Sequence, residues 1–144
     1  MSLKSAIDDA ISIVKRSRAI RLEDVPWRRV EDPRDWLRYK RLICEETGSK
    51  ELCVVLGELD PGRWLGLHHH ENIAEFYYAI SGRAKVTVED EEIDAREGTA
   101  IHIPPSAEHT IVNDGEERFI FIYGLNASSR PYVWDEPPEK YGGN

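Results

Sequence analysis

The feature that most constrains the fold is a series of about ten short apolar or alternating segments between Trp36 and Tyr123, separated by turn signals. Asp60-Pro61-Gly62 and Asp114-Gly115 are two of these turns. No stretch between the segments has the spacing of an amphipathic helix. Many short strands without intervening helices are typical of an all-β sandwich or barrel. The sequence therefore predicts an all-β domain over residues 36–124.

The two segments that flank the all-β domain have different sequence patterns. Apolar residues recur at helical spacing over residues 3–17 and predict an amphipathic helix, followed by an extended lead-in, so that residues 1–35 form an N-terminal unit. Its apolar face packs either on the chain's own domain or on a partner subunit. Residues 125–144 contain three prolines and predict an extended C-terminal tail that ends disordered.

The chemistry is concentrated where two histidines stand two residues apart. On a strand, the side chains of His68 and His70 point to one face and that of His69 points to the other. If the chain turns directly after His70, Glu75 on the next strand comes back to the same face. Two imidazoles and a carboxylate suit iron, manganese, nickel, copper or zinc, whereas calcium or magnesium requires more oxygen ligands.

Two spaced motifs resemble those of the cupin superfamily. The first combines Gly62, His68, His70, Glu75 and Gly82, and the second combines Gly98, Pro104, His109 and Asn113, with every spacing matched. Ser106 replaces the glycine that follows the proline in the second motif, and we expect only a small backbone adjustment there. The chain thus looks like a small single-domain metal-binding cupin of the cupin 2 type.

The resemblance covers residues 36–124 and implies a double-stranded β-helix, or jelly roll, with one divalent transition metal ion inside. It implies His68, His70, Glu75 and His109 as the ligands. The residue spacing indicates three of these independently, and His109 rests on the resemblance alone. His102 lies outside both motifs and is not expected to bind the metal.

The alternation of side chains along the predicted strands indicates which residues line the pocket. Trp64 shares the predicted face of His68, and Tyr77 shares that of Glu75, so both are candidate pocket residues. Tyr77 is the candidate catalytic proton donor, or else an aromatic that fills the barrel. Arg41 and Asn113 are further candidates for the substrate pocket. Arg41 would favour a carboxylate substrate if its side chain is interior, and Asn113 fits a buried hydrogen-bond network better than metal ligation.

Net charge limits the classes of binding partner, and the cysteines bear on the cellular compartment. With 19 Lys and Arg against 27 Asp and Glu, the net charge of −8 argues against nucleic acid and anionic membranes. The sequence contains no run of 18 apolar residues, and we expect a cytoplasmic protein. Cys44 and Cys53 fall opposite each other on a predicted hairpin, so they form either a cross-strand bridge or, as favoured in a reducing compartment, two buried thiols.

These observations predict a metal-dependent enzyme that acts on a small polar or carboxylate-bearing molecule, with a dioxygenase favoured. The alternatives are a lyase, decarboxylase or isomerase that uses the metal as a Lewis acid, and a non-catalytic binding or sensing protein. A barrel with a purely structural metal is the remaining possibility. We also expect a homodimer, because small barrels of this resemblance often pair and the N-terminal apolar face adds material for it.

Overall fold

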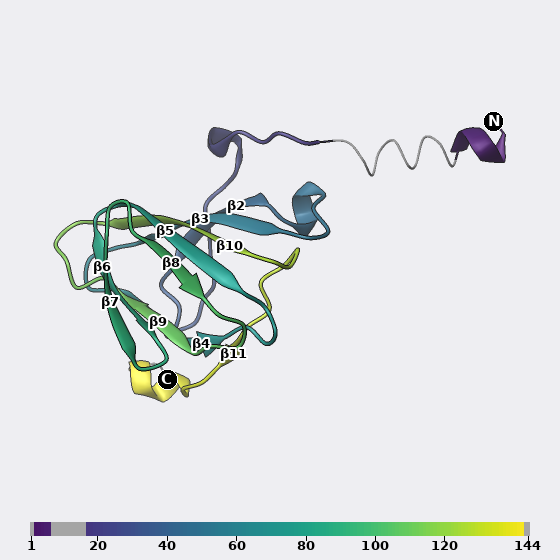
Figure 1. Ribbon diagram of the computed structural model, residues 1–144. Helices are drawn as coiled ribbons and strands as arrows, with labels where there is room; N and C mark the ends of the chain where they lie inside the picture. The colour runs from purple at the N-terminus through teal and green to yellow at the C-terminus, as the bar shows by residue number, and fades with distance from the viewer. Residues whose placement is uncertain (1, 7–16, 143–144) are drawn as a thin grey trace.

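The computed structural model describes residues 2–6 and 17–142, and its centre is a barrel of two antiparallel sheets (Figure 1). Residues 3–6 are helical. The larger part of the predicted N-terminal amphipathic helix, residues 7–16, lies outside the described residues. The predicted all-β jelly-roll architecture is confirmed for the barrel.

Six strands form one sheet in the order β1-β2-β3-β10-β5-β8: β1 (Arg28–Arg29), β2 (Arg38–Ile43), β3 (Cys53–Leu59), β10 (Phe119–Leu125), β5 (Glu75–Ser81) and β8 (Ala100–Ile103). Five strands form the other in the order β11-β4-β9-β6-β7: β11 (Val133–Trp134), β4 (Trp64–His69), β9 (His109–Val112), β6 (Arg83–Val88) and β7 (Glu91–Arg96). Three short 3₁₀ helices are η1 (Leu22–Asp24), η2 (Glu45–Thr47) and η3 (Pro138–Tyr141).

Alternation along the strands builds the core between the two sheets. In β5, Glu75, Tyr77 and Ala79 are buried, while the residues between them point outward. Because both sheets direct their apolar positions inward, the interior is closed by aliphatic and aromatic side chains that include Leu59, Val86, Ile111, Phe119 and Phe121. The polar cluster described below sits within this interior, where little water reaches it.

A register break in β4 changes which of its side chains face the core. The paired positions are Leu65 with Ile111 and His68 with His109, so two residues of β4 stand opposite one of β9. Such a bulge reverses the alternation on one side of it. Leu65 and His68 are therefore both buried, although they differ in parity.

The predicted extended C-terminal tail contains a strand and a 3₁₀ helix, and the predicted disordered end, residues 143–144, lies outside the described residues. Strand β11 pairs with β4, with Val133 opposite His69 and Trp134 opposite His68, and η3 follows it (Figure 1). The hydroxyl of Tyr141 accepts a hydrogen bond from the Leu67 amide at 3.1 Å. The aromatic residues of this segment give it apolar surface to bury, and it does so on the edge of the five-stranded sheet.

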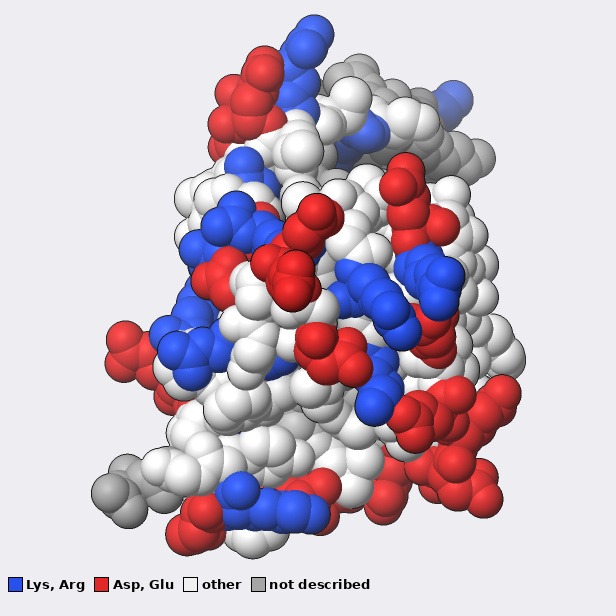
Figure 2. Space-filling view, turned by 90° about the vertical axis from the view of Figure 1, so that its left-hand side faces the viewer, with Lys and Arg blue, Asp and Glu red and all other residues white. Residues whose placement is uncertain are grey.

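Cys44 and Cys53 are both buried and both free, as the thiol alternative predicted. On the face shown in Figure 2, acidic and basic side chains are interspersed, and no continuous basic patch covers it. Within the described ranges, no helix has the length and apolar character needed to cross a membrane.

Candidate metal centre

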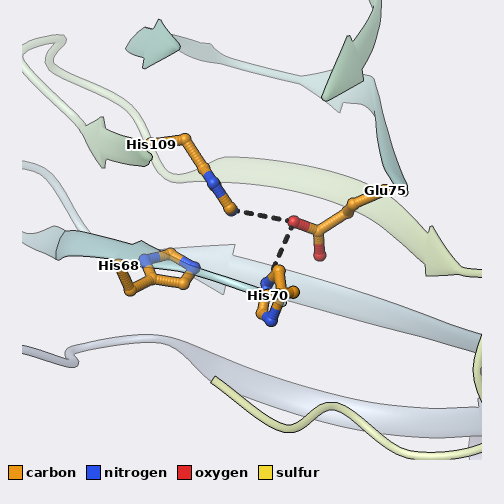
Figure 3. A group of neighbouring side chains, drawn as sticks. All are labelled: His68, His70, Glu75 and His109. Atoms are coloured by element: carbon orange, nitrogen blue, oxygen red, sulfur yellow. Dashed lines mark ion pairs between the residues drawn. The ribbon is translucent and has the colours of Figure 1, made fainter. Parts of the chain in front are cut away.

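Four side chains meet inside the barrel, three from strands and one from the residue that follows β4 (Figure 3). His68 lies near the end of β4 and His70 just beyond it, while Glu75 begins β5 and His109 begins β9. Each of the four residues is at most 2% exposed. Their potential ligand atoms all lie within 4.8 Å of one another. The structure thus brings together the four residues predicted as ligands.

Backbone carbonyl groups hold all three imidazole rings through Nδ1. The contacts are His68 Nδ1 to Gly66 O at 2.7 Å, His70 Nδ1 to Pro131 O at 2.7 Å and His109 Nδ1 to Ala107 O at 2.8 Å. A carbonyl oxygen only accepts, so in each ring Nδ1 carries the proton and donates it. This tautomer leaves a lone pair on every Nε2, which is the form that binds a metal.

The lone pairs point at a carboxylate. Oε1 of Glu75 lies 2.9 Å from His109 Nε2 and 3.3 Å from His70 Nε2 (Figure 3). These Nε2 atoms and both carboxylate oxygens are buried without a hydrogen-bond partner. Acceptors that face one another away from water are unfavourable unless a cation lies between them. A donor set of three nitrogens and one carboxylate fits a divalent transition metal ion.

The protonation states agree with this fit. Burial raises the pKa of the Glu75 carboxyl, but positive charge on the side of His109 and His70, which protons on these rings or a bound cation would supply, outweighs burial and holds the pKa below its ordinary value. Burial, together with His109 and Arg130, lowers the pKa of His68 well below its ordinary value. The carboxylate is therefore ionised and the imidazole neutral, as metal ligation requires.

Tyr77 lies beside the cluster, as the alternation of side chains along its strand predicted. Its ring centroid is 6.0 Å from that of His109, and its buried hydroxyl has no hydrogen-bond partner. Burial and then the charge of Glu75 raise the pKa of this phenol well above its ordinary value. The hydroxyl consequently stays protonated and is free to donate.

The predicted place of Trp64 in the pocket wall is wrong. The bulge in β4 turns Trp64 to the outer face, where it pairs with the half-exposed Val112. Its indole Nε1 donates to the Pro33 carbonyl at 3.0 Å, and its ring stacks on Tyr141 at 6.0 Å between centroids. Trp64 therefore anchors the two flanking segments against the outside of the barrel.

Two further pocket candidates have structural partners elsewhere. Arg41 forms an ion pair with Glu46 in a partly exposed position, so it does not line the metal cluster. Asn113 is buried, and its Nδ2 donates to the carbonyl groups of Leu59 and Glu117, both at 2.9 Å. This is the network role considered for Asn113, not a place in the pocket wall.

Arg130 is the residue at the site that the sequence did not indicate. It follows β10, in a segment predicted as a tail, and its Nη2 lies 3.3 Å from His68 Nε2. The signal that could have revealed it is the run Tyr132-Val133-Trp134, whose aromatic and β-branched residues favour a strand. A strand here returns the chain to the barrel and brings Arg130 with it.

Comparisons with known proteins agree with the geometry. The profile of the family described as "Cupin domain" matches residues 55–123. Dimethylsulfoniopropionate lyase DddW of Ruegeria pomeroyi is 34% identical over 113 residues, which are 77% of this chain and 73% of that protein. Oxalate decarboxylase OxdC of Bacillus subtilis is 33% identical over 79 residues, 51% of this chain and 20% of that protein.

A solved structure extends the likeness in fold. The polyketide cyclase RemF of Streptomyces resistomycificus superposes with a TM-score of 0.74 at 20% identity, over 86% of this chain and 89% of that one. At this identity the likeness concerns the barrel alone.

Proposed function

The chain belongs to the cupin family, and we propose that it is a metal-dependent lyase or decarboxylase that acts on a small carboxylate-bearing molecule. The observation that carries the proposal is the buried cluster in which the unpartnered Nε2 atoms of His70 and His109 face the Glu75 carboxylate, with a potential ligand atom of His68 within 4.8 Å. Such an arrangement is costly without a cation.

In this proposal His68, His70, Glu75 and His109 hold one divalent transition metal ion; iron, manganese, nickel, zinc and copper all fit the donor set. Four protein ligands leave up to two positions free on a six-coordinate ion. The bound ion would supply Lewis acidity toward a carboxylate or carbonyl oxygen of the substrate. The carbonyl groups of Gly66, Pro131 and Ala107 keep the imidazoles oriented for it.

The substrate class is supported by the relatives. One relative is named for dimethylsulfoniopropionate and the other for oxalate, and both molecules carry a carboxylate; the names describe a lyase and a decarboxylase. The lyase or decarboxylase alternative therefore has support that the favoured dioxygenase lacks. The dioxygenase stays a prediction, which the experiment below tests together with the proposal.

We assign the proton transfer to Tyr77. Its hydroxyl is buried beside Glu75 and His109 and has no partner of its own. The phenol is protonated at neutral pH, so it carries a proton that it can donate. In a decarboxylation it would donate its proton to the carbon from which carbon dioxide departs, and the tyrosinate would take up a proton from solvent.

The test is an anaerobic and aerobic assay of protein loaded separately with each candidate metal. Oxalate, dimethylsulfoniopropionate and a panel of short hydroxy and keto acids serve as substrates, with products followed by ¹³C nuclear magnetic resonance. The proposal expects turnover without oxygen. Turnover that requires oxygen would restore the dioxygenase, and a metal-loaded protein that binds members of the panel without converting any would indicate a binding protein.

We further propose that two copies pair through the outer face of the six-stranded sheet. Phe76, Tyr78 and Ile80 on β5 are 39–46% exposed and form an apolar row. Gly124 on the adjacent β10 lies beneath the Phe76 ring. A second copy is the natural occupant, since the same row on both chains is self-complementary about a two-fold axis.

Light scattering tests this pairing. Wild-type protein should have the mass of two chains, and Ile80→Lys should shift it to the mass of one, because a charge in the row opposes its burial. Lys85→Arg on β6, in the other sheet, is a control that should remain dimeric. A monomeric wild type would contradict the proposal.

The free thiols of Cys44 and Cys53 support the predicted cytoplasmic location, where disulfides are rare.

A further inference from the structure

The guanidinium of Arg130 is held at the metal cluster without a charge partner. Its Nη2 lies 3.3 Å from His68 Nε2, and its Nε is buried with no hydrogen-bond acceptor. Among the residues that the structure describes, no carboxylate lies within ion-pair distance of this guanidinium. Arg130 is partly buried and always charged, and a buried guanidinium nitrogen is rarely left without an acceptor, so the site lacks an anion that the described residues do not provide.

Two aromatic rings fix the position of this charge. The Arg130 Cζ lies 5.4 Å from the ring centroid of Tyr123 and 5.3 Å from that of Tyr132. Tyr123 belongs to β10, and Tyr132 directly precedes β11. Cation-π contacts from two elements hold the guanidinium in place but use none of its hydrogen-bond donors. The donors therefore remain available to a ligand.

His68 offers Arg130 an acceptor only through Nε2. This atom is the one that the proposed metal ion would occupy, because Nδ1 is already bonded to Gly66 O. Metal binding therefore takes away the hydrogen-bond acceptor of Arg130. A guanidinium with free donors would then stand beside the four clustered side chains, so that two positive centres lie close together.

We propose that Arg130 binds the carboxylate of the substrate, so that one carboxylate oxygen faces the metal and the other accepts hydrogen bonds from the guanidinium. This inference rests on the proposed function and deepens it by naming the residue that selects an acid over a neutral molecule. The planar fork of arginine matches a carboxylate in geometry as well as charge. Arg41, the candidate from the sequence, is engaged with Glu46 and leaves this role to Arg130.

The experiment uses the full-length protein loaded with Co²⁺, whose visible absorption reports changes at the metal. Glycolate and propionate are titrated as carboxylate probes, and glycolamide as the neutral counterpart. Wild type should show a saturable change with the acids and a weaker one with the amide. Arg130→Gln should require at least about 30-fold more acid for the same change and lose the preference for acid over amide.

Two variants accompany it. Arg130→Lys keeps the charge but not the fork and should fall between wild type and Arg130→Gln. Arg83→Gln removes an exposed arginine on β6, whose partner is Asp94, and should behave as wild type. Cobalt content and circular dichroism of each variant show whether it folds and holds metal, and Arg130→Lys provides the comparison if Arg130→Gln does not fold.

The outcomes separate the two proposals. A wild type that takes up no Co²⁺ would contradict the metal site and the inference with it. A loaded wild type that binds no acid, or a loaded Arg130→Gln or Arg130→Lys that binds acids as wild type does, would overturn the role of Arg130 and leave the metal site intact.

Discussion

Nδ1 of His70 lies 2.7 Å from the carbonyl oxygen of Pro131, a residue 61 positions further along the chain. The C-terminal segment therefore orients one of the four clustered side chains as well as carrying Arg130. It also covers the edge of β4 through β11. The segment is part of the site and not an appendage to the barrel.

Removal of this segment should weaken metal binding. A chain that ends after Ser129 lacks the acceptor of the His70 ring, and loss of such an orienting contact lowers metal affinity by about 10- to 100-fold. The affinity is measured by competition with a chromophoric chelator. A chain that ends after Gly142 is the control and should bind as the full chain does. Equal affinity of the Ser129 truncation, with its fold retained, would contradict the orienting role.

Replacement of Tyr77 by Phe should separate catalysis from binding. The change removes only the unpartnered hydroxyl, so metal content and fold should persist while kcat falls by about 10²- to 10⁴-fold. Tyr78→Phe is the matched control, since Tyr78 is the next residue on β5 and points outward. Unchanged kcat in Tyr77→Phe would show that the tyrosine only fills the barrel.

Trp64→Ala tests whether the side chain of Trp64 lies outside the barrel, where the bulge in β4 places it. The indole stacks on Tyr141 and bonds to the Pro33 carbonyl outside the barrel, so its loss should lower the free energy of unfolding by about 1 to 3 kcal/mol. Metal content per folded chain should stay that of wild type. Loss of metal without loss of stability would return Trp64 to the pocket wall.

The buried thiol of Cys53 predicts how the stability of the fold depends on pH. Burial raises its pKa from 9.0 to about 11, so the folded state favours the neutral thiol. Its stabilising contribution is complete below pH 9 and is lost as the pH rises from about 9 to about 11. Chemical unfolding at intervals over this range should show a steeper fall in stability for wild type than for Cys53→Ala. Parallel curves for the two proteins would contradict the shift.

Most of the barrel could be predicted because strand alternation and turn residues are local properties. His68, His70 and Glu75 could be predicted for the same reason, because a single turn between two neighbouring strands brings their side chains together. Trp64 was misplaced because a bulge depends on pairing with β9, which no local pattern reveals.

Arg130 was missed for a related reason. Its place at the site depends on β11 pairing with β4, a contact between segments more than 60 residues apart, whereas the prolines and final glycines of the segment suggested an extended tail. Ser106 shows a milder case: it adopts a φ of 66°, the left-handed conformation for which glycine is preferred. Its hydroxyl accepts a hydrogen bond from the Asn72 amide at 2.9 Å, a contact that glycine could not make and that favours serine here.

The metal content of untagged protein tests the central claim most directly. After loading and gel filtration, elemental analysis should give about one equivalent of a divalent transition metal per chain, and the double variant His68→Ala, His70→Ala should give almost none. Arg83→Gln should retain the wild-type content. Metal retained in the folded double variant, or a wild type that holds none, would contradict the assignment of the buried cluster as a metal centre.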